Sequence, residues 1–336
     1  MKVLVLRFSS IGDIVLTSPV LRCLKNQLKG VEIHYLTKKK FFGLLEHNPN
    51  ISKIYTFESS LENVLSILKK ENYDVVLDLH NNLRSNYIKL ILGKASFALK
   101  KLNFQKWLYV NLKKDFLPDV HIVERYLETV KSLGVKNDGK GLDFFPCDCD
   151  RIENEDIPNE IQDFPYAILS IGGTHFTKKM PVKKWIELAG KIPIPLVIIG
   201  GKEDLEVGQS IEKELIAGGK KVWNTCGQFS IGGSAHLIKK AALTITHDTG
   251  MMHIAAAFQI PTVAIWGNTT PKLGMYPYKT QYINLEVNNL ACRPCSKIGF
   301  SACPKSHFDC MKKQDFSQKS LQLFINQAIE SFITNA

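Results

Sequence analysis

The chain has 336 residues, of which 45% are hydrophobic, and its 43 Lys and Arg against 32 Asp and Glu give a formal net charge of +11. This length and composition indicate a globular protein with two domains. The positive charge favours anionic partners: nucleic acid, an acidic membrane surface or a phosphorylated substrate. The chain opens on a strand pattern rather than a signal peptide, and its apolar runs are too short to cross a membrane, so we expect a cytoplasmic protein.

The first half alternates short β-rich runs with helical patterns, which predicts a doubly wound α/β domain. The expected strands are Val3–Phe8, Glu32–Leu36, Lys53–Thr56 and Val75–Leu79. The expected helices are Pro19–Leu28, Phe41–Glu46 and Leu61–Lys70.

The acidic segment Cys147–Pro165 lacks periodicity and is expected to be a connector. A second α/β series follows it, with the expected strands and helices Tyr166–Ile171, Val182–Ala189, Leu196–Ile199, Leu205–Ile216 and Thr244–Thr246. We therefore predict two Rossmann-like domains, residues 1–155 and 156–336. The last helix, Gln318–Thr334, packs on one of the two halves, and the sequence leaves open which.

The segment His247–Ala257 reads as a strand end, a small-residue turn and a short apolar helix, and the buried strand Ile260–Gly267 follows it. This arrangement points the free backbone N–H groups of a helix N-terminus at an anion. A phosphate or a pyrophosphate is the expected ligand.

The first strand leads directly into the turn Ser9–Val15. Gly12 permits a tight turn, and Asp13 is expected at the carboxyl edge of the sheet, where ligands bind. Asp13 is either a helix-capping carboxylate or a catalytic group. The turn has neither Gly-x-Gly-x-x-Gly nor Gly-Lys-Ser/Thr, which disfavours a conventional NAD site and a P-loop.

A third loop, Ser170–Pro181, combines glycines and hydroxyl groups with Lys178 and Lys179. Backbone donors, hydroxyl donors and positive charge in one loop suit a diphosphate. The alternative is an exposed basic loop that ends where Pro181 starts the next helix.

Four segments, in this order, resemble the ADP-heptose:lipopolysaccharide heptosyltransferase family, glycosyltransferase family 9. They are Ser9–Asp13, Thr177–Pro181, Gly200–Asp204 and Asp248–His253, and the resemblance covers nearly the whole chain. It implies a GT-B fold, in which two Rossmann-like domains face each other across a cleft, with the acceptor on the N-terminal half and the nucleotide sugar on the C-terminal half. It also implies an inverting transfer of a heptose, or a related sugar, from an ADP-sugar to a lipopolysaccharide inner-core or similar glycan acceptor.

The resemblance also suggests catalytic roles by matching position. Asp13 becomes the candidate general base for the acceptor hydroxyl. Lys178 becomes the candidate cation for the departing diphosphate, assisted by the hydroxyl groups of Thr174 and Thr177 and by the helix N-terminus. Together these donors take the place of a divalent metal, so no cofactor is expected for catalysis.

Further donor-side candidates come from the same segments: Glu203, Asp204, Asp248, Thr249, Gly250, Met251, Met252 and His253. Glu203 or Asp204 either accepts hydrogen bonds from the ribose or caps the following helix. Asp248 is expected to bind sugar hydroxyls or to orient the loop. His253 either faces the nucleotide or is a structural histidine.

The acceptor-side candidates are Ser9, Ser10, Gly12, His80 and Arg84. A glutamine often stands in the family at the place of His80, so this position departs from the pattern. Arg84 either pairs with an anionic group of the acceptor or anchors a helix.

Between Lys94 and Lys114, lysines alternate with Phe104, Trp107, Leu108 and Tyr109. Lysines and aromatic side chains together suit a lipid headgroup surface, and the family's acceptor is a phosphorylated lipid at the inner membrane. We expect peripheral contact with that membrane or with an anionic lipid-linked acceptor; the alternative is an ordinary helix with a solvated face. We expect a monomer.

Eight cysteines without a secretion signal argue against a disulfide scaffold. Four of them, Cys292, Cys295, Cys303 and Cys310, have the spacing C-x2-C-x7-C-x6-C. This spacing suits a structural zinc ion, although free thiols or redox-sensitive pairs are the alternatives.

Two other classes of function compete with the transferase. A nucleic-acid-binding protein would use the positive charge, but the chain has no recognisable DNA- or RNA-binding motif, so we expect no nucleic-acid partner. A non-catalytic nucleotide-sugar-binding protein would keep the anion site and need no general base.

Overall fold

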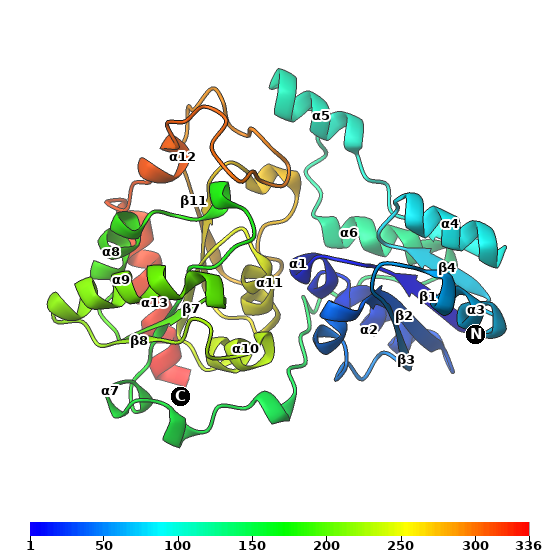
Figure 1. Cartoon of the computed structure of the whole chain (residues 1–336), viewed down its shortest axis with the longest axis horizontal. Coiled ribbons are helices and arrows are strands. Elements are labelled where there is room, and N and C mark those ends of the chain that lie inside the picture. Colours follow the sequence, from blue (N-terminus) through cyan, green and yellow to red (C-terminus); the bar gives the residue numbers. More distant parts are fainter. Residues whose placement is uncertain (336) are drawn as a thin grey trace. The chain divides into compact units, whose positions relative to one another are not determined.

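The computed structural model describes residues 1–335, which form two compact units, each built on one parallel sheet (Figure 1). Unit 1 consists of residues 1–102 and 120–147. Unit 2 consists of residues 103–119 and the described residues from 148 onward. The predicted pair of Rossmann-like domains is confirmed.

Unit 1 has five strands in the order β3-β2-β1-β4-β5. They are β1 (Lys2–Leu6), β2 (Glu32–Lys38), β3 (Lys53–Phe57), β4 (Val75–Asp78) and β5 (Ala95–Ala98). The helices of this unit are α1 (Ile11–Val15), α2 (Ser18–Gln27), α3 (Glu62–Lys70), α4 (Leu83–Leu92) and α6 (Ile122–Leu127), with 3-10 helices η1 (Lys39–Leu44) and η2 (Glu128–Leu133). The helix expected at Phe41–Glu46 is therefore the 3-10 helix η1.

Strand β1 shows why these residues form a central strand. Its residues Val3 to Leu6 are all completely buried. Leu4 and Leu6 share a hydrophobic cluster with Leu65 and Leu68 of α3. Because helices cover both faces of a parallel sheet, its central strands are continuous apolar runs rather than alternating ones.

Unit 2 has six strands in the order β11-β10-β9-β6-β7-β8. They are β6 (Ala167–Ser170), β7 (Leu196–Ile199), β8 (Val222–Asn224), β9 (Leu243–His247), β10 (Thr262–Trp266) and β11 (Tyr282–Glu286). The α-helices of this unit are α5 (Asn103–Leu112), α7 (Asn159–Gln162), α8 (Val182–Gly190), α9 (Leu205–Ala217), α10 (Ile231–Lys239), α11 (Gly250–Ala257), α12 (Asp309–Lys312) and α13 (Lys319–Asn335). Its 3-10 helices are η3 (Asp148–Asp150), η4 (Asn154–Asp156), η5 (Phe176–Lys178), η6 (Lys202–Asp204) and η7 (Pro271–Leu273).

Successive side chains of β10 point to opposite faces of the unit 2 sheet, as strand geometry requires. Val263 and Ile265 belong to the large cluster that α8, α9 and α13 complete, and in Figure 1 these helices lie on one side of the sheet, with α10 and α11 on the other. Ala264 and Trp266 pack with Met252 of α11 instead. The last helix, α13, thus belongs to unit 2, which answers the question that the sequence left open.

The observed units differ from the predicted boundary at residue 155. The chain passes from unit 1 to unit 2 after residue 147, and residues 103–119 join unit 2. Their contacts explain this: Lys113 Nζ lies 3.2 Å from the main-chain oxygen of Cys292, and Lys272 Nζ lies 2.7 Å from Asp115 Oδ2. Within residues 1–335, no helix is both long enough and apolar enough to cross a bilayer.

The packing of α13 predicts a specific loss of stability. Ile325 is completely buried in the unit 2 cluster, whereas Leu323 on the same helix is 59% exposed. We expect Ile325→Ala to lower the free energy of unfolding by about 2–5 kcal/mol, because it leaves a cavity. The control Leu323→Ala should change it by less than about 0.5 kcal/mol. Denaturant titration of the unit 2 transition measures both, and equal effects would contradict the observed packing.

Candidate active site

Strands β6 and β9 meet at the centre of the unit 2 sheet. They pair in parallel from Ala167 with Leu243 to Ser170 with Thr246. The next strands along the chain, β7 and β10, lie on opposite sides of this pair. The loops after β6 and β9 therefore diverge, which is the usual ligand-binding position of a doubly wound sheet.

Lys178 and Asp248 form an ion pair at this position. Lys178 Nζ lies 2.6 Å from Asp248 Oδ2 and 3.0 Å from the main-chain oxygen of Asp248. Asp248 Oδ2 also accepts a hydrogen bond of 2.8 Å from Thr269 Oγ1. The side chains of Lys178 and Asp248 are 17% and 12% exposed. The structure thus brings together Lys178, the candidate cation for the diphosphate, and Asp248, a candidate to bind the sugar hydroxyls.

The N-terminus of α11 lies beside this pair, since Asp248 and Thr249 lead directly into the helix. Thr249 is the N-cap of α11. Among the described residues, its side chain accepts no hydrogen bond from the first amides of this helix. A Cβ added to Gly173 would lie 3.4 Å from Thr249 Cγ2, so the loop after β6 passes close to this end of the helix. Unsatisfied amides and the helix dipole favour an anion here.

The other candidates on α11 differ in exposure. Gly250 and Met251 are partly buried at its first turn. Met252 is completely buried, and His253 is 2% exposed. The burial of His253 favours its structural alternative over a ligand-facing role.

The loop after β6 places its two threonines differently. Thr174 is exposed. Thr177 is 1% exposed, and its hydroxyl accepts a hydrogen bond of 2.8 Å from the Phe300 amide. The buried Thr177 hydroxyl therefore stabilises the loop through its bond to Phe300. This arrangement does not support its expected role as a hydroxyl donor to the diphosphate.

Asp204 and Lys179 form a second ion pair, with 2.6 Å between Lys179 Nζ and Asp204 Oδ1. Asp204 also accepts a hydrogen bond of 3.0 Å from the Gly201 amide, as a capping carboxylate does. This geometry favours the helix-cap alternative for Asp204. Glu203 is exposed and stays a candidate for the ribose.

His247, at the end of β9, was not among the predicted site residues. Its Nε2 accepts a hydrogen bond of 2.9 Å from the Met180 amide, and its Nδ1 lies 3.5 Å from the Gly172 carbonyl oxygen. Burial lowers the pKa of His247 to about 4, so the imidazole is neutral and can accept at one nitrogen and donate at the other. His247 thus ties together both ends of the loop that carries Lys178.

In unit 1, Asp13 lies in the first turn of α1, directly after β1. Its Oδ2 accepts hydrogen bonds from the Ser10 hydroxyl at 2.8 Å and from the Ser10 amide at 3.2 Å. Its Oδ1 lies 2.6 Å from Arg7 Nη2, and the Asp13 side chain is 22% exposed. Burial raises the pKa of Asp13, but the charge of Arg7 and the hydrogen bonds from Ser10 outweigh it, so this pKa lies below its usual value. Asp13 is therefore an ionised, helix-capping carboxylate.

Arg7 is the buried charged partner of Asp13, and the sequence analysis missed it. Its guanidinium donates to the main-chain oxygens of Ser9, at 2.8 Å, and Leu79, at 2.6 Å, in addition to pairing with Asp13. These bonds join the turn after β1 to the end of β4. A charged residue after an apolar strand was the signal that could have identified it, because buried charges need partners.

The remaining acceptor-side candidates lie after β1 and β4. Gly12 is buried within α1. The ring of His80 packs on Phe8, with 4.7 Å between ring centroids, and burial together with the charge of Arg7 lowers the pKa of His80 to about 4. Arg84 is exposed in the first turn of α4. His80 is thus neutral near pH 7 and brings no positive charge to an anionic acceptor.

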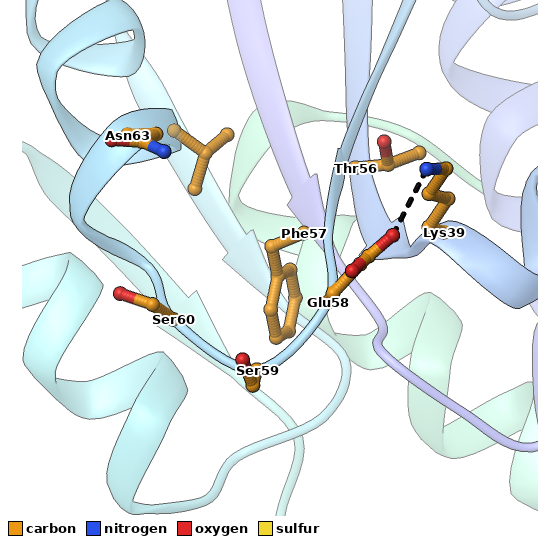
Figure 2. Close-up of a pocket in the computed structure, with 8 residues that line it drawn as sticks. Lys39, Thr56, Phe57, Glu58, Ser59, Ser60 and Asn63 are labelled. Carbon is orange, nitrogen blue, oxygen red and sulfur yellow. Dashed lines mark hydrogen bonds and ion pairs between the residues drawn. The ribbon is translucent and has the colours of Figure 1, made fainter.

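Unit 1 also contains a pocket of about 310 Å³ at the carboxyl end of β3 (Figure 2). Hydroxyl and amide groups of Ser59, Ser60 and Asn63 line it, and Lys39 pairs with Glu58 at 2.9 Å across one side. This pocket and Asp13 lie at the same edge of the sheet, because all five strands are parallel.

The four-cysteine segment follows β11, and its cysteines are free thiols, whereas Cys147 and Cys149 are disulfide-bonded. Cys292 Sγ lies 3.7 Å from His307 Nε2. Among the described residues, no group of three or more His, Cys, Asp or Glu is placed to hold a metal ion. The zinc site stays a prediction from spacing that this geometry does not support.

A family model and individual relatives both compare this chain with heptosyltransferases. A model of glycosyltransferase family 9 (heptosyltransferase) matches residues 63–304. Lipopolysaccharide heptosyltransferase 1 of Pseudomonas aeruginosa is 24% identical over 320 residues, which cover 88% of this chain and 86% of that protein.

Solved structures share the fold. E. coli ADP-heptose lps heptosyltransferase II superposes with a TM-score of 0.72 and 18% identity, with 100% of both chains covered. E. coli heptosyltransferase WaaC with ADP gives a TM-score of 0.66 and 19% identity, covering 98% of this chain and 100% of that one. The expected GT-B fold is confirmed.

The buried His247 predicts a pH dependence of stability. Its pKa falls from the ordinary 6.5 to about 4 on folding. As the pH falls below about 6.5, the unfolded chain binds a proton that the folded chain refuses, so stability present above this pH is lost towards pH 4. We expect wild-type protein to lose on the order of 3 kcal/mol more than His247→Gln between pH 7 and pH 4.

Denaturant titration at several pH values measures this difference. The control is His47→Gln, because the His47 side chain is 40% exposed. The control should follow the wild-type pH dependence. If His247→Gln follows it as well, His247 is not the buried neutral group described above.

Proposed function

The chain belongs to glycosyltransferase family 9, and on this premise we propose that it transfers a heptose, or a related sugar, from an ADP-sugar to a lipopolysaccharide inner-core or similar glycan acceptor, with inversion at the anomeric carbon. The observation that carries the proposal is the position of Lys178, Asp248 and the uncapped N-terminus of α11 at the point where β6 and β9 diverge. A solved relative, E. coli WaaC, is described with ADP, the product that such a donor leaves.

In this mechanism the acceptor hydroxyl attacks the anomeric carbon as the bond to the diphosphate breaks. Lys178 and the first amides of α11 stabilise the charge that grows on the departing β-phosphate. These groups do the work that a divalent cation does at other diphosphate sites. The Asp248 carboxylate, held beside the diphosphate, accepts hydrogen bonds from the sugar hydroxyls.

Asp13 takes the proton of the acceptor hydroxyl. A carboxylate has about four acceptor positions. Arg7 and the two donors of Ser10 occupy three of them, so one stays available to the acceptor. The lowered pKa means that Asp13 enters the reaction ionised. Its capping role and its proposed catalytic role are thus compatible, because the cap fixes where the carboxylate points.

We also propose that residues 103–119 contact an anionic lipid surface. Phe104, Trp107 and Phe116 are 68%, 52% and 64% exposed, and no residue of α5 is buried. Lys114 in the same segment is exposed as well. Exposed aromatic rings beside lysines suit the headgroup region of an acidic membrane, where a lipid-linked acceptor would lie. The site would then work at the cytoplasmic face of the inner membrane.

The central test replaces Asp13 by Asn, which keeps the size of the side chain and removes its charge. We expect the rate of heptosyl transfer from ADP-heptose to fall about 10²–10⁴-fold, because the general base is lost. The affinity for ADP, measured by calorimetry, should stay within about twofold, because ADP binds unit 2. The control Glu62→Gln removes an exposed carboxylate of unit 1 and should leave both quantities unchanged.

A rate for Asp13→Asn within about tenfold of wild type would exclude Asp13 as the base. If the wild-type protein binds ADP and ADP-sugars but transfers nothing to any glycan, it is instead a nucleotide-sugar-binding protein.

The membrane proposal is tested by sedimentation with vesicles. We expect wild-type protein to bind vesicles rich in phosphatidylglycerol, and to bind phosphatidylcholine vesicles weakly. The double variant Phe104→Ser/Trp107→Ser should bind the acidic vesicles at least about tenfold more weakly, because two apolar anchors are lost. The control Ile216→Ser changes a side chain that is 53% exposed elsewhere on unit 2. Equal binding by the double variant and the control would rule out α5 as the contact.

A further inference from the structure

Two donors share one oxygen of Asp248. Lys178 Nζ lies 2.6 Å from Oδ2, and Thr269 Oγ1 donates to the same atom at 2.8 Å. Thr269 follows β10 and is 1% exposed, so its hydroxyl has no ready exchange with bulk water. The carboxylate is therefore satisfied from two neighbouring loops at once.

This sharing matters when a diphosphate arrives. Lys178 has three N–H groups, and two of them point to Asp248, one to the carboxylate and one to the main-chain oxygen. A diphosphate that offers several oxygens to Lys178 competes with the carboxylate for the same cation. If Lys178 shifts towards the phosphate, a carboxylate that is only 12% exposed loses a charged partner, which is costly unless another donor stays. Thr269 is that donor.

Arg293 fixes the backbone that carries Thr269. Its Nε donates to the Gly267 carbonyl oxygen at 2.7 Å, and its Nη2 donates to the Thr269 carbonyl oxygen at 2.8 Å. Glu286 pairs with the same guanidinium at 2.6 Å, and the Arg293 side chain is 8% exposed. The loop after β10 also packs tightly against the loop of Lys178, since a Cβ added to Gly267 would lie 2.6 Å from the Thr177 carbonyl oxygen.

We propose that Thr269 and Arg293 are positioning residues for the donor site: the Thr269 hydroxyl holds Asp248 so that Lys178 is free to bind the diphosphate, and Arg293 holds Thr269 in place. Neither residue needs to touch the substrate. The inference rests on the proposed function of Lys178 and assigns a part in it to the segment between β11 and α12, which contains Cys292, Cys295 and Cys303.

The test measures ADP affinity by calorimetry in matched variants of the full chain. Thr269→Val keeps the shape and removes the hydroxyl, and it should weaken ADP binding by about tenfold or more. Thr269→Ser keeps the hydroxyl and loses a methyl group, and it should bind within about twofold of wild type. The control Thr270→Val removes the neighbouring hydroxyl, which is not bonded to Asp248, and should also bind like wild type.

This pattern separates positioning from packing. If the threonine only fills space, Val will behave like wild type and Ser will be the weaker variant, which would overturn the inference. Arg293→Lys should weaken ADP binding in the same direction as Thr269→Val. Thermal unfolding shows whether Arg293→Lys is folded. If it is not, the Thr269 variants alone test the inference.

A double-mutant cycle shows whether the effect passes through Lys178. In a Lys178→Met background, Thr269→Val should cause no further loss of ADP affinity, because there is no cation left to release. A full additional loss would overturn the inference. If Lys178→Met weakens ADP binding and Thr269→Val does not, the inference fails and the proposed function stands. If wild-type protein does not bind ADP, both fail.

Discussion

Parallel pairing between strands that are not consecutive in the chain, β1 with β4 and β6 with β9, determines where the candidate site residues lie. In a parallel sheet all strands end at one edge, so the loops after them are neighbours regardless of their separation in sequence. The pairing of β6 with β9 places Lys178 beside Asp248, 70 residues further along the chain. The pairing of β1 with β4 brings Arg7 to the carbonyl of Leu79.

Buried charges in both units follow the same rule, because each has a partner of opposite sign. Asp13 has Arg7, Asp204 has Lys179, and Arg293 has Glu286. Removing one partner of such a pair costs more than the pair itself contributes, since the other charge stays buried. Structure and proposed chemistry therefore use the same contacts. The capping role of Asp13 is compatible with its proposed catalytic role, because the capping contacts orient its carboxylate.

The sequence predicted most of the central strands correctly, because a strand that is covered on both faces is a visible apolar run. It missed β5, β8 and β11 at the edges of the sheets, where short or partly exposed strands show no such run. The motifs located the loops that carry Lys178 and Asp248, but not the residues that support those loops. Arg293 lies in a segment whose cysteines suggested a metal, and no local pattern shows that its guanidinium reaches a loop 24 residues earlier.

Lys178 and Lys179, in the loop after β6, each have a carboxylate oxygen at 2.6 Å. The charges of these two lysines are consequently balanced within the proposed donor site, although the chain as a whole carries a formal net charge of +11. Lysines that are balanced in this way exert little long-range attraction on polyanions. A ligand gains binding free energy from these lysines only if its shape lets it rearrange the two ion pairs at short range. Selectivity therefore arises at contact and not during approach.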